Sequence, residues 1–248
     1  MNEKLQSAVD PDGKWIYRVG GIAAFVLVLG YFATFPLYAS AGIAPTGAEA
    51  QLLHYAPHLT EWWAILGLMV FTDLLYIPIW LALYRVLKGI NRNVMALALI
   101  CKGLFVALDL AFTWTNYAAL FNLSHDYVMA ANDIQRAAIV SSAGAAAAVM
   151  DSLMLKIIAI LIPSLGTFLA GFVLLKGTFG KGAAVLSFAV GFTGILAALG
   201  PIFTDALGTM HIINALLATG WYLIVGWRLY RFGQHANNLL RQAAFASD

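Results

Sequence analysis

Charged residues are scarce in this sequence: only 10% of its 248 residues are Asp, Glu, Lys or Arg, whereas 62% are hydrophobic. In soluble domains about a quarter of all residues are charged. This composition therefore excludes an ordinary soluble fold and indicates a chain that lies in a lipid bilayer. The net charge of +2 is small, and the basic residues are scattered along the chain, which argues against nucleic acid as a partner.

Cysteine is also nearly absent. The single Cys101 lies within an apolar segment, which excludes a disulfide framework, a CxxC redox motif and a zinc site built on thiolates. The sequence further lacks a glycine-rich phosphate loop, an HExxH motif and paired histidines at the helical spacing of a membrane cytochrome. No cofactor is therefore expected.

Long apolar runs are what the sequence has in abundance. A helix needs about 20 apolar residues to cross the hydrocarbon layer of a membrane. Six such runs predict an all-α fold, a single-domain six-helix membrane bundle, with spans at 17–39, 62–84, 94–121, 150–175, 182–200 and 206–228. The apolar stretch between Arg136 and Lys176 is about twice the length of one span. We therefore expect an additional extracytoplasmic helix, residues 127–148, before the fourth span.

Basic residues are concentrated in alternate connections, and Lys and Arg accumulate on the cytoplasmic side of a membrane. Eleven of the 14 lie in four segments: Lys4, Lys14, Arg18, Arg85, Lys88, Arg92, Lys176, Lys181, Arg228, Arg231 and Arg241. The three remaining connections contain only Arg136. Both termini are therefore predicted to be cytoplasmic, and the basic, amphipathic tail, residues 229–248, is predicted to lie along the cytoplasmic surface.

Ionisable residues inside an apolar span are costly, so each one predicts a partner or a functional site. Counted from the basic residues at the cytoplasmic ends, Asp73 lies about 18 Å into the second span and Lys102 about 15 Å into the third. Because a short turn joins these two helices, the similar depth predicts a buried ion pair between Asp73 and Lys102. In the third span, Lys102, Asp109 and Thr113 recur at helical spacing, so this face is expected to point into the bundle.

A second cluster is predicted nearer the outer surface. The same count places Asp109 and His211 at about 25 Å and Lys156 at about 30 Å, on three different spans. Asn214 shares a helical face with His211. Because an imidazole titrates near neutral pH, these four residues predict a site for proton-linked passage or binding of a small solute.

Three histidines outside the predicted spans could in principle ligate a metal. His54 and His58 flank Pro57 in the segment HYAPH, and His125 is a third histidine in another loop. Two histidines on one face of a helix can hold zinc, but Pro57 interrupts the helix that would align them. They are weak candidates, and no metal site is predicted.

The hairpin FTDLLYIPIWLALYRVLKGINRNVMALALICKGL resembles a bacterial family of six-helix membrane proteins called domain of unknown function 4386. Its members are similar in an Asp-Leu pair in the second helix, a basic turn with Asn-Arg, and a later hairpin like GFVLLKGTFGKGAAVLSFAVGFTGIL. The resemblance implies a six-helix bundle in a bacterial cytoplasmic membrane. It implies no activity.

Three classes of function are compatible with the sequence. A small-solute or proton-linked transporter or binding protein is favoured by the polar layers and by the prolines within the second and fourth spans. A structural or accessory subunit of a larger membrane complex, or a homo-oligomer, is favoured by the absence of a reaction motif and by long outer segments. A membrane-embedded enzyme would need a metal site among the outer histidines.

Overall fold

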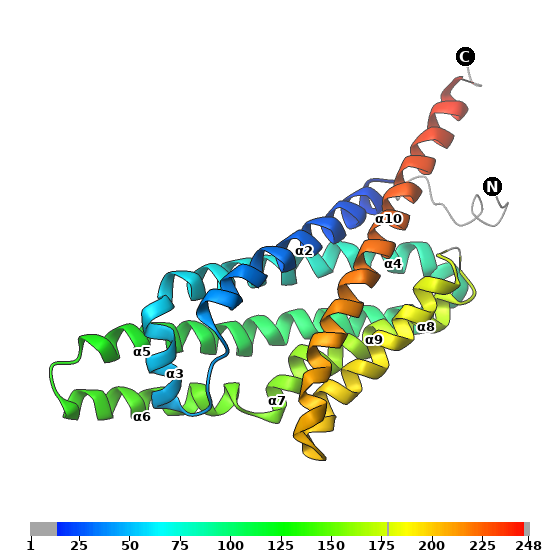
Figure 1. Cartoon of the computed structure of the whole chain (residues 1–248). Coiled ribbons are helices and arrows are strands. Elements are labelled where there is room, and N and C mark those ends of the chain that lie inside the picture. The colour runs from blue at the N-terminus through cyan, green and yellow to red at the C-terminus, as the bar shows by residue number, and fades with distance from the viewer. Residues whose placement is uncertain (1–13, 178, 246–248) are drawn as a thin grey trace.

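The computed structural model describes residues 14–177 and 179–245 of the chain. Regular structure in these ranges is entirely helical, as the sequence predicts (Figure 1). The α-helices are α2 (Lys14–Ala41), α3 (Ala48–Tyr55), α4 (Leu59–Leu108), α5 (Thr115–Met129), α6 (Asp133–Met150), α7 (Leu153–Lys156), α8 (Ile162–Leu174), α9 (Lys181–Leu199) and α10 (Met210–Phe245). Two π-helical segments, η3 (Asp109–Trp114) and η4 (Ile157–Leu161), join α4 to α5 and α7 to α8. Short 3-10 turns are η2 (Ala56–His58), η5 (Gly200–Ile202) and η6 (Asp205–Thr209).

Several helices are long and apolar enough to cross a membrane. Five such stretches lie within the described ranges: Trp15–Ala41, Ala48–Met129, Leu153–Leu174, Lys181–Ile202 and Ala206–His235. The second has 82 residues and reverses its direction at Asn91, where φ of −154° and ψ of 95° leave the helical region. Asn91 also accepts a hydrogen bond from the backbone nitrogen of Val94, which caps the returning arm. The hairpin can therefore supply two crossings, and the chain has the character of a multi-pass membrane protein.

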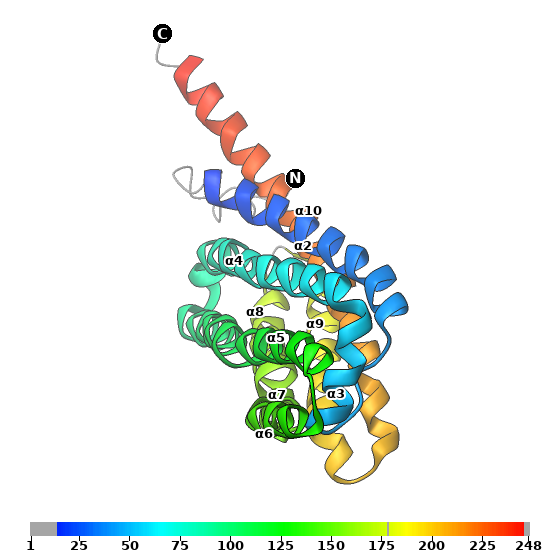
Figure 2. The same ribbon diagram turned by 90° about the vertical axis from the view of Figure 1, so that its left-hand side faces the viewer.

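The two arms of this hairpin lie side by side in both views (Figures 1 and 2). The first arm, residues 59–90, contains the predicted second span. The second arm, residues 92–108, continues through η3 into α5 and contains the predicted third span. α2 packs on α4 and α10, while α8 packs on α4 and α9. The start of α2 and the C-terminal half of α10 lie at the same end of the molecule (Figure 1).

The additional helix before the fourth span is present as α6, which lies beside α5 (Figure 1). It starts at Asp133 instead of residue 127, because α5 continues to Met129 and a turn follows it. Asn132 ends that turn as a helix cap, its side chain accepting a hydrogen bond of 2.9 Å from the backbone nitrogen of Gln135. At its other end, α6 is separated from α7 by Asp151 and Ser152.

The C-terminal tail is helical as far as Phe245. Residues 229–245 prolong α10 without interruption (Figure 1), and their position at the cytoplasmic surface stays a prediction. The first turn of the predicted tail is anchored in the core: Leu229 is fully buried, and the Phe232 ring lies 5.4 Å from that of Phe179. Residues 246–248 and the segment 1–13, which includes Lys4, lie outside the described ranges.

Buried apolar side chains form two clusters. The larger one fills the space among α2, α4, α8, α9 and α10. The smaller one joins α3, the start of α4, α5 and α6 and includes Tyr55, Trp62 and Phe121, whose rings contact one another edge to face or tilted. Backbones approach closely where α2 meets α10, since a Cβ atom on Gly21 would lie 2.9 Å from the carbonyl oxygen of Gly226. Such small-residue contacts are typical of helix packing in membranes.

Candidate functional site

Two carboxyl groups meet inside the hairpin. Asp73 lies on the first arm of α4, Asp109 is the first residue of η3, and each side chain is only 4% exposed. The two carboxyls are close enough to share a hydrogen bond. Asp73 and Asp109 lie equally far along the chain on either side of Asn91, where the arms reverse, so the hairpin brings them to the same level. We call these two residues the carboxyl pair.

Each member of the carboxyl pair has a further hydrogen-bond donor from η3. The Trp114 indole Nε1 donates to Oδ2 of Asp73 over 2.6 Å, and the Thr113 hydroxyl donates to Oδ1 of Asp109 over 2.5 Å. In a π-helix the hydrogen bonds join residues five apart, so Trp114 lies one turn beyond Asp109 and faces the same arm. The π-helical geometry therefore places an indole donor where regular α-helical spacing would not.

Two tyrosines, Tyr31 and Tyr76, interact electrostatically with the carboxyl pair. Tyr31 from α2 lies close enough to both carboxyls to interact electrostatically with each. Its hydroxyl forms a short hydrogen bond with the hydroxyl of Tyr76 on α4. Tyr76 in turn packs edge to face on Tyr222 of α10, with ring centroids 5.3 Å apart. Three helices thus contribute to one buried polar network.

The predicted ion pair between Asp73 and Lys102 is not found in the described part of the chain. No carboxylate there lies within 4.0 Å of Lys102. Its ammonium instead faces three aromatic rings, 4.9 Å from the centroid of Trp80, 5.4 Å from Tyr76 and 6.0 Å from Tyr222. The physical reason is register: Lys102 and Trp80 are equally far from Asn91, which puts Lys102 level with Trp80 and about two turns from Asp73.

The predicted outer cluster is also not assembled as proposed. Asp109 is buried in the carboxyl pair, whereas Lys156 at the end of α7 and His211 at the start of α10 are exposed. The His211 Nδ1 lies 2.6 Å from the carbonyl oxygen of Gly208. Asn214 serves helix packing, because its amide nitrogen donates to the Val190 carbonyl on α9 over 2.6 Å. No hydrogen bond or ion pair among described residues joins Asp109, Lys156 and His211.

The outer histidines do not form a metal centre in the described residues, where no group of three His, Cys, Asp or Glu side chains could hold an ion. His54 packs against the rings of Tyr55 and Trp62. The His58 Nδ1 lies 3.7 Å from a carboxylate oxygen of Glu61, one turn further on. His125 is an exposed residue on α5.

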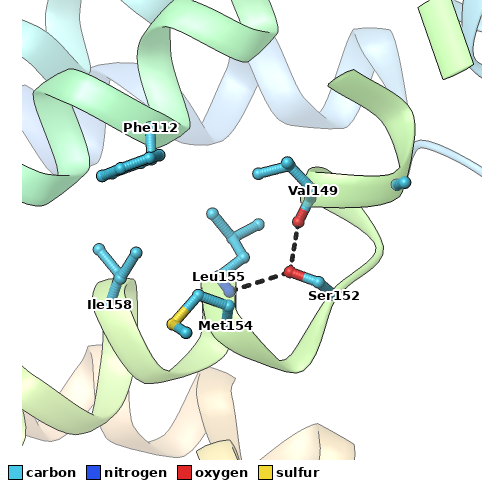
Figure 3. Close-up of a pocket in the computed structure, with 7 residues that line it drawn as sticks. Phe112, Val149, Ser152, Met154, Leu155 and Ile158 are labelled. Atoms are coloured by element: carbon cyan, nitrogen blue, oxygen red, sulfur yellow. Dashed lines mark hydrogen bonds between the residues drawn. The ribbon is translucent and has the colours of Figure 1, made fainter. Parts of the chain in front are cut away.

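An apolar pocket of about 300 Å³ lies where the two π-helical segments face each other. Phe112 of η3 and Ile158 of η4 line opposite sides of it, and Val149, Met154 and Leu155 complete the wall (Figure 3). The Ser152 hydroxyl is engaged by the carbonyl of Val149, to which it donates over 2.6 Å, and the rest of the lining is almost wholly hydrocarbon. The pocket suits an apolar group, and it offers no ligand for an ion.

Sequence reasoning missed the aromatic residues that surround the polar groups. Asp73, Tyr76 and Trp80 lie at spacings of three and four, so the sequence does place them on one helical face. Trp114 had no such pattern, because only the π-helical turn brings it to Asp73.

Comparisons of the chain with family models, curated proteins and solved structures found no match.

Proposed function

We propose that this protein is a proton-linked carrier of a small solute in a bacterial inner membrane, with both termini cytoplasmic and the carboxyl pair as its proton-carrying site. One observation carries the proposal. Two acidic side chains, Asp73 and Asp109, lie together in the interior of a membrane protein, and no basic group of the described residues is within 4.0 Å of either.

The chemistry of the carboxyl pair supports proton binding. Two carboxylates in contact repel strongly when both are charged, and burial in a membrane removes the water that would screen them. One bound proton removes that repulsion and forms a hydrogen bond between the carboxyls. Coupled carboxyl pairs bind and release their protons as a unit, which is the property that a proton-linked carrier requires.

The local helix geometry supports a moving part at the same place. Asp109 opens one π-helical segment, η3, and a second, η4, lies against it just before Pro163. π-helical turns inside α-helices are frequent at functional sites. We propose that η3 changes to α-helical hydrogen bonding by a local shift. Such a shift in η3 would separate Trp114 from Asp73 and so alter the surroundings of the bound proton.

The proposal is tested without knowing the solute. We would record infrared spectra of the purified protein over a range of pH, comparing wild type with Asp73→Asn and Asp109→Asn. The absorption of a protonated carboxyl group should titrate in wild type and be lost in both variants. The control is Asp126→Asn, which changes an exposed acid on α5 and should leave the buried signal intact.

The second measurement is proton movement across liposomes that contain the protein and a pH-sensitive dye, after addition of panels of cationic, anionic and neutral small solutes. Wild type and Asp126→Asn should move protons when a transported solute is added, whereas the two variants of the carboxyl pair should not. Absence of both the titrating band and proton movement in folded wild type would remove the transport proposal. A structural or accessory subunit would then be the better interpretation.

A further inference from the structure

Lys102 is held in an unusual way for a buried cation. Its side chain is 4% exposed, and its ammonium faces the rings of Tyr76 and Trp80 from α4 and of Tyr222 from α10. We call these three rings the aromatic cage. The faces of aromatic rings carry partial negative charge, and rings within about 6 Å of a cation attract it. The cage therefore stabilises the buried ammonium of Lys102 by electrostatic attraction, a role that a carboxylate usually has.

The cage is fixed by contacts that do not involve Lys102. The Trp80 indole stacks on Trp221 with centroids 5.5 Å apart, and its Nε1 donates to the Tyr222 hydroxyl over 3.2 Å. The Trp221 Nε1 donates to Ser187 of α9 over 2.6 Å. Tyr76 packs edge to face on Tyr222. Because each ring has its own support, the cage should persist when the lysine leaves it.

The lysine has the flexibility to leave. Its four-carbon stem passes Gly166 of α8, where an added Cβ atom would lie 3.4 Å from the Lys102 Cε. Glycine at that position therefore lets α8 pack closely on the stem without a side chain that would pin it. A rigid cage with a flexible, tethered cation inside it is the arrangement of a binding site that is filled by part of its own chain.

We infer that the aromatic cage is a binding site for a small organic ammonium cation, and that Lys102 occupies the site when this ligand is absent. The inference rests on the proposed function, because it names the solute class that the carboxyl pair would exchange for a proton. Rings of tyrosine and tryptophan are the common recognition elements for alkylammonium groups. The carboxyl pair supplies the acidic partner, through Tyr31, which interacts with both carboxyls and with Tyr76.

The inference predicts that removing the tethered cation opens the site. Radiolabelled tetramethylammonium should bind weakly to purified wild type and at least about tenfold more tightly to Lys102→Met, because a site that is mostly occupied by its own lysine has a reduced apparent affinity. Propylammonium should compete, and neopentyl alcohol, which is uncharged and of similar size, should not. Lys156→Met is the matched control, since it removes an exposed lysine and should bind as wild type does.

A second substitution locates the ligand. Trp80→Leu added to Lys102→Met should abolish tetramethylammonium binding if the ligand sits among the rings. If Lys102→Met proves unstable, Lys102→Ala prepared with and without tetramethylammonium replaces it: the ligand should raise the melting temperature of this variant and leave wild type nearly unchanged.

The outcomes separate this inference from the proposed function. Folded Lys102→Met that binds no tetramethylammonium, or Lys102→Ala that the ligand does not stabilise, would show that the cage only holds a lysine. The titrating carboxyl band would be unaffected by that result, so proton-linked transport would survive without this ligand class. Cation binding without a titrating band would instead support the cage and overturn the role of the carboxyl pair.

Discussion

Asparagine in place of Asp73 gives the clearest stability test of the buried charges. If Asp73 were the partner of Lys102, the substitution would leave an uncompensated buried ammonium and cost about 3–5 kcal/mol of unfolding free energy. In the structure the ammonium faces the aromatic cage instead, so Asp73→Asn removes nothing from Lys102. The amide oxygen can still accept the hydrogen bond that the Trp114 indole donates to Asp73.

The expected sign is toward stabilisation. Two unit charges about 4 Å apart repel by roughly 4 kcal/mol at an effective dielectric constant of 20, which is an upper limit because a proton shared by the pair cancels most of it. An amide opposite Asp109 carries no charge and can donate a hydrogen bond to it. We therefore expect Asp73→Asn to change the unfolding free energy by less than about 1 kcal/mol or to increase it slightly.

The assay is the melting temperature of the purified protein in detergent at neutral pH. For a chain of this size about 1 kcal/mol corresponds to roughly 2–4 °C, so the ion-pair hypothesis predicts a loss of about 6–20 °C and the carboxyl pair predicts little change or a gain. Asp126→Asn controls for loss of an acid at the surface. A large loss that a second substitution, Lys102→Met, restores would refute the reasoning.

Two further predictions concern the packing and the orientation of the helices. Gly21→Ala should cost about 1–3 kcal/mol, because the new Cβ would lie 2.7 Å from the backbone nitrogen of Tyr230 and force α2 away from α10. Gly103→Ala, where a Cβ would meet no atom within 4 Å, should be neutral or stabilise the helix by about 1 kcal/mol, and melting temperatures compare the two. Cysteines placed at Lys88 and Lys181 should react with a membrane-impermeant maleimide only from the cytoplasmic side, and labelling from outside would contradict the predicted orientation.

The fold class could be predicted from the sequence. The thickness of a membrane sets the length of an apolar spanning helix, so each span is recognised without knowing which other helices it packs against. A reversal within the basic and polar second connection could also be predicted, although not its position at Asn91. The packing of Leu229 and Phe232 in the core could not be predicted, because it depends on a contact between segments that are distant in the sequence.

The pairing of the charged residues was mispredicted for a specific reason. Depth was counted from Arg85 and Arg92, and these residues do not lie equally far from the reversal at Asn91. Counted from Asn91 itself, Asp73 is level with Asp109. The basic residues of a connection show its side of the membrane, whereas only the turning residue shows its register. That residue is identified by its backbone angles, which the sequence does not give.

The two members of the carboxyl pair carry charge of the same sign, and this helps to distinguish a proton-binding site from a purely structural contact. A buried contact that only ties two membrane helices together is best made with opposite charges, neutral hydrogen-bonding groups or apolar side chains, each of which avoids repulsion. Two acids in contact lower the stability of the hairpin unless they hold a proton. Lys102, a buried cation of the same hairpin, faces aromatic rings instead of relieving that repulsion. A pair that costs stability whenever it is fully charged is physically suited to binding and releasing a proton, and poorly suited to serving only as a structural link.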